Sequence, residues 1–225
     1  NPITAANITF TTGMDPSLEA YYPFNGNAND ESGNSYHGQL GDNNTTSKFP
    51  TKTTDRYGNV DKAFSFDGND YINFGTGILS GDGEFTIVLW INVVTNTFQW
   101  SHIHQKRDTS INGEYVVELK YNGKIRFWTY GGGFKWTVTS SSAVNDGSWH
   151  HLAFVQKDNG GQMYLDGSLD QTDNSSGKVN LGLNLKIYMG GDLRDNNRYY
   201  SGKIDDLRIY SRALSANEIQ TLYNN

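Results

Sequence analysis

Pairs of Asn-Gly and Asp-Gly recur through this sequence, and they separate short runs rich in aromatic and β-branched residues. Either pair readily takes the positive φ of a type I′ turn, the tight turn that joins two antiparallel strands. The clearest case is Asn122-Gly123, because alternating runs flank it on both sides. This punctuation predicts strands at residues 63–66, 71–74, 84–94, 99–106, 114–121, 124–130, 134–139, 150–156, 162–165, 186–189 and 203–210.

One helix is predicted, at the C-terminal end of the chain. Ser215 and Glu218 have the spacing of a capping box, and Ile219, Leu222 and Tyr223 follow at the spacing of one helical face. Many short strands with one terminal helix are typical of an all-β fold. We therefore predict an antiparallel two-sheet β-sandwich (jelly roll) with one short C-terminal helix.

The length of 225 residues fits one large sandwich domain. We assign this domain to residues 17–225 and interpret residues 1–16, which lack a clear hydrophobic period, as a linker or edge segment. Residues 1–13 are polar and contain no basic segment, so they do not have the pattern of a signal peptide. The chain has no cysteine, which excludes a disulfide framework and thiol chemistry.

The charge balance restricts the partners that the chain could bind. Its formal net charge is −6, so its surface has no overall attraction for the phosphates of nucleic acids or for anionic lipids. No apolar run approaches the roughly 20 residues that cross a bilayer as a helix. We therefore expect neither a nucleic-acid partner nor membrane insertion.

Four stretches follow one another along the chain: residues 21–33 (YYPFNGNANDESG), 63–68 (AFSFDG), 146–153 (DGSWHHLA) and 202–215 (GKIDDLRIYSRALS). In sequence and order they resemble the laminin-G-like jelly-roll domains of the concanavalin A-like lectin/glucanase family. The resemblance extends over about residues 18–224 and implies the same jelly roll. It implies less about activity, because such domains bind glycans, bind proteins or act as spacers. They occur widely in secreted bacterial enzymes and adhesins, so we expect a secreted or cell-surface bacterial protein.

The loop that begins at Asn25 is rich in side-chain oxygens. Calcium takes about six to eight oxygen ligands, including backbone carbonyls. The resemblance implies a structural calcium where this loop meets the last strand, held by Asn25, Asp30 and Asp205. Asp206 is expected to point to the other face of that strand. The alternative is a loop of Asx turns that holds no ion.

Alternation in the middle strands predicts a polar and aromatic outer face. If Ile125 and Phe127 face the core, then Arg126, Trp128 and Tyr130 face outward. With the neighbouring strands, the predicted ligand-binding residues are Trp100, His102, His104, Glu118, Arg126, Trp128 and Tyr130. Aromatic rings beside planar hydrogen-bonding groups suit sugars, which present apolar C–H faces and hydroxyl edges. The alternative is a face covered by another domain or by the loop at residues 25–59. A second candidate is the rim segment at residues 192–200.

Catalysis is not expected. The same fold hosts laminarinase-type β-glucanases, in which two glutamates flank an aspartate on one strand face. Here Glu114 and Glu118 share a face, but Val116 stands where the aspartate would be. Glycosidases need paired carboxylates roughly 5–9 Å apart, and no motif of another catalytic class is present. A lyase-like role for His102 or His104 with Tyr130 is the remaining catalytic alternative, and only the types of these residues favour it.

The adjacent His150 and His151 are interpreted as packing residues, together with Trp90 and Trp149. Neighbouring residues on a strand point to opposite faces, so these two histidines cannot hold one ion together.

These patterns predict a non-catalytic carbohydrate-binding module of a secreted bacterial polysaccharide-degrading enzyme or adhesin. The expected partners are a polysaccharide or oligosaccharide and the adjacent domains of a larger secreted protein. The alternative is a protein-interaction or spacer domain of a cell-surface protein. An open aromatic face favours the first hypothesis, whereas a flat, polar or covered face favours the second.

Overall fold

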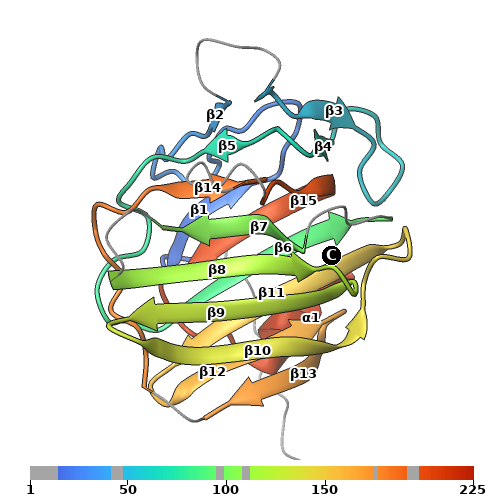
Figure 1. Ribbon diagram of the computed structural model, residues 1–225. Helices are drawn as coiled ribbons and strands as arrows, with labels where there is room; N and C mark the ends of the chain where they lie inside the picture. The colour runs from blue at the N-terminus through green and yellow to red at the C-terminus, as the bar shows by residue number, and fades with distance from the viewer. Residues whose placement is uncertain (1–14, 42–47, 95–98, 108–111, 175–176, 192–197) are drawn as a thin grey trace, which may run out of the picture.

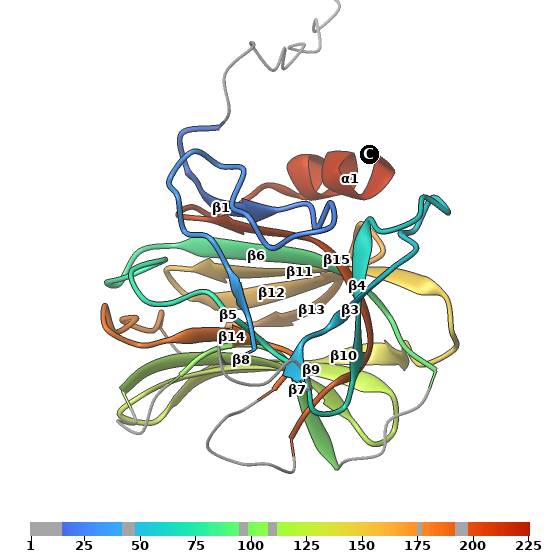
Figure 2. The ribbon, with the colours of Figure 1, turned by 90° about the horizontal axis from the view of Figure 1, so that it is seen from above.

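The computed structural model describes residues 15–41, 48–94, 99–107, 112–174, 177–191 and 198–225. Over these residues the chain forms two antiparallel sheets that pack face to face, with one helix outside them. Figure 1 looks onto one of these sheets, which we call the front sheet, and the back sheet lies behind it. Figure 2 shows the sheets as two layers. The predicted two-sheet β-sandwich is confirmed.

The front sheet has the order β10-β9-β8-β7-β14-β5-β2. Its strands are β2 (Gln39–Leu40), β5 (Ile72–Asn73), β7 (Trp100–Lys106), β8 (Asn112–Lys120), β9 (Lys124–Gly131), β10 (Phe134–Ala143) and β14 (Ile187–Met189). The turn between β8 and β9 is the predicted Asn122-Gly123 hairpin, in which Gly123 takes a φ of 77°. Strands β7 to β10 therefore form a meander in which sequence neighbours are also spatial neighbours.

The back sheet has the order β13-β12-β11-β6-β15-β4-β3, and β1 also pairs with β15. Its strands are β1 (Leu18–Tyr22), β3 (Thr51–Thr53), β4 (Ala63–Asp67), β6 (Phe85–Asn92), β11 (Trp149–Lys157), β12 (Gly160–Leu165), β13 (Ser168–Asp173) and β15 (Ser201–Tyr210). The central pair of β6 and β15 joins the middle of the chain to its end, so the fold depends on long-range contacts.

The hydrophobic core lies between the two sheets. On β6, Ile87, Leu89 and Ile91 are fully buried and recur with the period of two that a strand requires. From the front sheet, Phe127 stacks on Phe154 of β11 with ring centroids 4.8 Å apart. Because Phe127 faces inward, the residues on either side of it along β9 face outward.

Helix α1 (Ala216–Asn224) lies over the outer face of the back sheet (Figure 2). Its capping box is complete, since the Ser215 hydroxyl accepts a bond from the Glu218 N–H and the Glu218 carboxylate accepts one from the Ser215 N–H. Ile219 is fully buried in a second apolar cluster that includes Val88 and Tyr164. The predicted helix is confirmed. Among the described residues, no helix is long and apolar enough to cross a membrane.

Arg212 ties the beginning of the described chain to this helix. Its Nη2 donates to Glu218 Oε1 at 2.7 Å, and its Nε donates to Ser17 Oγ at 2.9 Å. The Ser211 N–H also donates to the Ser17 carbonyl at 2.8 Å. Strand β1 and helix α1 are thus held on the same side of the sandwich. The proposed linker at residues 1–16 lies almost entirely outside the described residues and stays a prediction.

The structure adds strands β1, β2, β3 and β13 to those predicted. Strands β2 and β3 contain two and three residues inside a long polar stretch, too few to show a hydrophobic period. Strand β13 (SLDQTD) lies at an edge of its sheet and is polar except for Leu169, and polar side chains are a usual way to protect an edge strand. Such strands give no alternating signal in the sequence.

Candidate functional site

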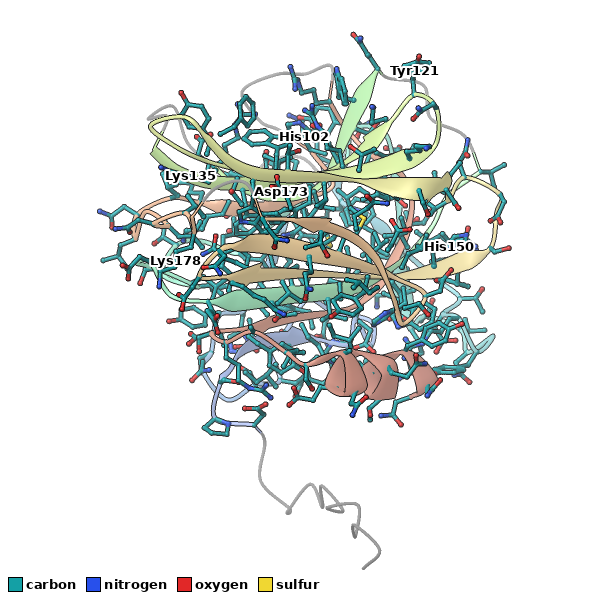
Figure 3. All side chains as sticks on the ribbon, turned by 90° about the horizontal axis from the view of Figure 1, so that it is seen from below. His102, Tyr121, Lys135, His150, Asp173 and Lys178 are labelled. Carbon is teal, nitrogen blue, oxygen red and sulfur yellow. The ribbon has the colours of Figure 1, made fainter. Side chains whose placement is uncertain are left out.

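A hollow of about 330 Å³ opens on the outer face of the front sheet, and we call it the front-sheet hollow. Its described lining residues are Arg107, Glu114, Arg126, Trp128, Tyr130, Phe134 and Arg198. Strand β9 provides three of them at alternate positions, as the sequence predicted for Arg126, Trp128 and Tyr130. Figure 3 shows helix α1 on one side of the sandwich and the sheet that carries His102 on the other. The front-sheet hollow therefore faces away from the helix.

Three aromatic rings line the hollow. Trp128 is 6% exposed, whereas Phe134 at the start of β10 is 64% exposed. The Phe134 ring meets Trp128 and Tyr130 edge to face, at centroid distances of 5.7 and 5.5 Å. The Trp128 Nε1–H is buried and has no hydrogen-bond partner among the described residues. A buried donor left unpaired costs about 1–3 kcal/mol, so an acceptor that enters the hollow would relieve this cost.

Arg107, which follows β7 directly, links the acidic and aromatic sides of the hollow. Its Nε donates to Glu114 Oε2 at 3.2 Å. Its guanidinium carbon lies 5.1 Å from the centroid of the Trp128 ring. Glu114 is therefore ion-paired, and the charge of Arg107 lies over an aromatic face, where the ring quadrupole attracts it.

Glu118 on β8 is also ion-paired. Arg126 Nε donates a short hydrogen bond to Glu118 Oε1, and His102 Nε2 lies 3.4 Å from Glu118 Oε2. Burial would raise the pKa of Glu118, but the bond to His102 and the charge of Arg126 together lower it below its ordinary value. The carboxylate is thus ionised at neutral pH and held in place by two partners.

His102 connects this ion pair to the segment that carries Arg198. The His102 N–H donates to the Arg198 carbonyl at 2.8 Å, and Arg198 Nη1 lies 3.4 Å from His102 Nε2. On the other side of the ring, His102 Nδ1 lies 2.9 Å from Gln105 Oε1, and Gln105 Nε2 donates to the Gly191 carbonyl. His102 is fully buried, so it positions groups of the face rather than forming part of its surface.

The prediction that His104 faces outward is wrong. The register between β7 and β8 shifts between His102 and His104, and this bulge turns His104 into the core. There its ring stacks on Tyr115 at 5.6 Å, and burial lowers its pKa to about 3. A strict period of two fails at a bulge because one strand gains a residue.

Trp100 lies on the predicted face, but it does not line the front-sheet hollow. The Arg126 guanidinium carbon lies 4.3 Å from its ring centroid, and Lys120 Nζ lies 5.4 Å from it. Cationic side chains of the chain itself therefore lie over the Trp100 ring. Its direct contact is with Arg126, which it helps to hold in one orientation.

Sequence reasoning found part of this site. It placed Arg126, Trp128 and Tyr130 correctly on the outer face, and it missed Phe134 and Arg107 as lining residues. Phe134, Trp136 and Val138 share one strand parity, yet Trp136 and Val138 are buried in the core. A register shift between Phe134 and Thr137 reverses the direction of Phe134. Of the second candidate segment, residues 192–197 lie outside the described residues, while Arg198 lines the same hollow.

The residues predicted to hold calcium have other partners. Asp30 accepts hydrogen bonds from the backbone N–H groups of Tyr21, Ser32 and Tyr36, and these bonds lower its pKa although burial alone would raise it. Asn25 is exposed. Among the described residues, no group of three or more His, Cys, Asp or Glu side chains could hold a metal. A calcium ion here would have to displace N–H donors from Asp30.

Asp205 is occupied by a cation of the chain. Arg56 Nη1 lies 2.8 Å from Asp205 Oδ2, and Arg56 Nη2 lies 3.1 Å from Asp206 Oδ2. The expectation that Asp206 points to the other face is therefore wrong, because a bulge between Asp205 and Arg208 brings both carboxylates to one guanidinium. Burial raises the pKa of Asp205 to about 7 although Arg56 lies beside it. A structural calcium at Asn25, Asp30 and Asp205 stays a prediction.

Comparison with known families adds to this geometry. Residues 66–220 match the family described as the concanavalin A-like lectin/glucanases superfamily. The chain belongs to this superfamily. The match covers the strands of the lectin/glucanase sandwich from the end of β4 to the helix, including the whole of β7 to β10. A search among curated proteins finds no match to the chain.

Solved structures share the lectin/glucanase-type fold. Domain 4 of AbnA, a GH43 extracellular arabinanase from Geobacillus stearothermophilus solved in complex with arabinotriose, has 22% identity and a TM-score of 0.71, over 92% of this chain and 98% of that one. The binding domain of Paraclostridial Mosquitocidal Protein 1 has 17% identity and a TM-score of 0.71, over 92% and 52%. The botulinum neurotoxin serotype D ligand binding domain, in complex with N-acetylneuraminic acid, has 19% identity and a TM-score of 0.67, over 92% and 50%. This chain thus spans nearly all of the arabinanase domain and about half of each toxin domain.

Proposed function

We propose that this chain is a non-catalytic carbohydrate-binding module and that it binds sugar in the front-sheet hollow. The observation that carries the proposal is the joint lining of this open hollow by aromatic rings and guanidinium groups. Sugar rings present apolar C–H faces to aromatic side chains and hydroxyl edges to planar hydrogen-bonding groups. Phe134 and Tyr130 at the rim provide the first kind of contact, and Arg126 provides the second.

Two of the similar solved structures support this proposal. The arabinanase domain was solved with arabinotriose and the neurotoxin domain with N-acetylneuraminic acid, so sandwiches of this fold accommodate sugars of different kinds. Their low identity to this chain means that the likeness concerns the fold. The sugar and its position on this chain are inferred from the residues of the front-sheet hollow.

The state of the two glutamates supports a binding role rather than a catalytic one. A glycosidase needs one carboxyl group whose raised pKa keeps it protonated, so that it can give its proton to the leaving group. Glu118 has a lowered pKa and two ion partners, and Glu114 is paired with Arg107. Val116 lies between them on β8. Glu118 is therefore not suited to donate a proton for glycoside hydrolysis, and Glu114 is held in an ion pair.

We further propose that the module belongs to a larger secreted or surface-attached bacterial protein that acts on or adheres to polysaccharide. A structural calcium is a separate proposal, and sugar binding does not depend on it. The combination of aromatic and guanidinium side chains that lines the front-sheet hollow favours glycan binding over the protein-interaction or spacer role.

A glycan array tests the proposal most directly. The chain should bind at least one glycan class, and Trp128→Ala should weaken that binding about tenfold or more, because the floor of the hollow is lost. Trp128→Phe keeps a ring beneath Arg107 but removes the Nε1 donor, so it should lose less. Thermal unfolding of each variant separates a lost contact from a lost fold. An array without any bound glycan, or equal binding by a folded Trp128→Ala, would contradict the proposal.

A further inference from the structure

The front-sheet hollow is lined by more cationic than anionic groups. Three of its described lining residues are arginines and one is a glutamate. The whole chain carries a formal net charge of −6, so the hollow is positively charged on a protein that is negatively charged overall. An excess of positive charge in a concave site on an acidic protein attracts anionic ligands in particular.

Arg126 is held in a way that leaves its terminal nitrogens available. Its Nε is bonded to Glu118, and its guanidinium plane lies 4.3 Å from the Trp100 ring centroid. Its side chain remains 29% exposed. Within the described part of the chain, its Nη1 and Nη2 have no hydrogen-bond partner. One edge and one face of the guanidinium are thus fixed, and the Nη1–Nη2 edge is left to point at a ligand.

This arrangement suits an oxyanion better than a hydroxyl group. Two parallel N–H donors of a guanidinium match the two oxygens of a carboxylate or of a sulfate, and such bidentate bonds are stronger than neutral ones. Both carboxylates of this face are ion-paired, Glu114 with Arg107 and Glu118 with Arg126 and His102, so neither adds an unbalanced negative charge that would repel an anion.

We propose that the ligand of the front-sheet hollow is an acidic glycan, and that the Nη1–Nη2 edge of Arg126 binds its carboxylate or sulfate group. The inference rests on the proposed sugar-binding function and specifies its ligand class. Fixing the guanidinium before binding reduces the entropy that the complex would otherwise lose, which favours affinity. The aromatic rim at Phe134 then contacts the ring of the same or the next sugar.

The first arm of the test varies the ligand and leaves the chain unchanged. Binding of uronic-acid oligosaccharides is measured by calorimetry beside their carboxyl-reduced neutral counterparts and a sulfated neutral oligosaccharide. One charged hydrogen-bonded contact is worth about 1.5–3 kcal/mol, so at least one acidic ligand should bind about tenfold or more tightly than its neutral counterpart. Preference for the uronate or for the sulfate identifies which oxyanion is bound.

The second arm varies the chain. Arg126→Lys keeps the positive charge beside Glu118 but removes the paired donors, so the acidic-to-neutral affinity ratio should fall about tenfold. Lys135→Ala removes a cation from outside this hollow and should leave the ratio unchanged. Thermal unfolding checks that both variants fold.

The outcomes separate the two proposals. If neutral and acidic glycans bind equally well and Trp128→Ala weakens both, the chain binds sugar but the acidic ligand class is wrong. If the acidic preference survives Arg126→Lys in a folded variant, the role of Arg126 is wrong. If no glycan of any charge binds, both the sugar-binding function and its acidic ligand are overturned.

Discussion

The two outer faces of the sandwich contain the same kinds of residue in different surroundings. On the back sheet, the guanidinium carbon of Arg56 lies 4.9 Å from the Trp90 ring centroid, and on the front sheet that of Arg107 lies 5.1 Å from the Trp128 ring centroid. Trp90 also stacks on Tyr223 of helix α1 at 5.6 Å, whereas Trp128 lines an open hollow.

The difference between the faces is the helix. His151 and Trp90 on the back sheet are buried beneath Tyr223, and their rings pack against one another and against the tyrosine ring. On the front sheet, the described residues place no helix over the hollow. The same pairing of an arginine with a tryptophan is thus buried under the helix on the back sheet and lines a hollow on the front sheet.

The largest expected effect comes from uncovering the back sheet. Ile219→Ala should lower the free energy of unfolding by about 2–5 kcal/mol, because it leaves a cavity beneath the helix. Urea denaturation measures this loss. Leu169→Ala is the control, since that side chain is 53% exposed and its loss should change stability by no more than about 0.5 kcal/mol. Glycan affinity of folded Ile219→Ala should be unchanged, and a comparable loss of affinity would show that the two faces are coupled.

The next prediction concerns the proposed calcium ion, which Asp205 of the back sheet would help to bind. At a hundredfold excess over Kd, an ion that binds only the folded chain stabilises it by about 2.7 kcal/mol, which is a rise in Tm of roughly 5–10 °C. Asp205→Asn should abolish this rise, and Asp158→Ala, which removes a carboxylate elsewhere, should keep it. A Tm that responds to neither calcium nor EDTA would contradict the proposal and leave Arg56 as the cation of Asp205.

The covered face should also make stability depend on pH. Burial lowers the pKa of His151 to about 3, whereas an unfolded histidine titrates near 6.5. Its contribution to stability is therefore complete above pH 6.5 and is lost as the pH falls toward 3. Between pH 7 and pH 5 this one group should cost about 2 kcal/mol. His151→Phe should reduce the difference between urea denaturation at the two pH values by that amount, and an unchanged difference would mean that His151 titrates normally.

The smallest effect concerns the open face. Phe134→Ala should reduce glycan affinity by about 0.5–1.5 kcal/mol, the value of one aromatic contact. Its unfolding free energy should change by no more than about 0.5 kcal/mol, because the ring is largely exposed. Tyr57→Ala is the matched control, since it removes an aromatic ring that is 61% exposed outside the hollow. Equal losses of affinity in both variants would show that the contact is not specific to the front-sheet hollow.

Local patterns were sufficient to predict the fold and three residues of the hollow. Turn dipeptides and alternation along β9 act within a few residues, so Arg126, Trp128 and Tyr130 could be assigned to the outer face. The errors occur at bulges, where the register shifts near His104 and Phe134 and the side chains reverse direction. A bulge depends on the partner strand and leaves no regular mark in the sequence.

Other features of the site depend on contacts between distant segments. Arg198 reaches the hollow because its backbone is bonded to His102 on β7, far away along the chain. The pairing of Arg56 with Asp205 likewise joins a loop to the last strand. The sequence contained these residues, but neither spacing nor period could show that they meet.

The contacts that Arg212 makes to Ser17 and Glu218 determine how this domain can be attached to something else. Both β1 and the C-terminal helix lie on the side away from β7 to β10 (Figure 2). A bead, a tag or a neighbouring polypeptide joined at the C-terminal helix would therefore leave the hollow facing outward, free to reach an insoluble surface. Immobilised through its C-terminal helix, the domain should keep its full binding capacity, whereas attachment at Phe134, which lines the hollow, should block it.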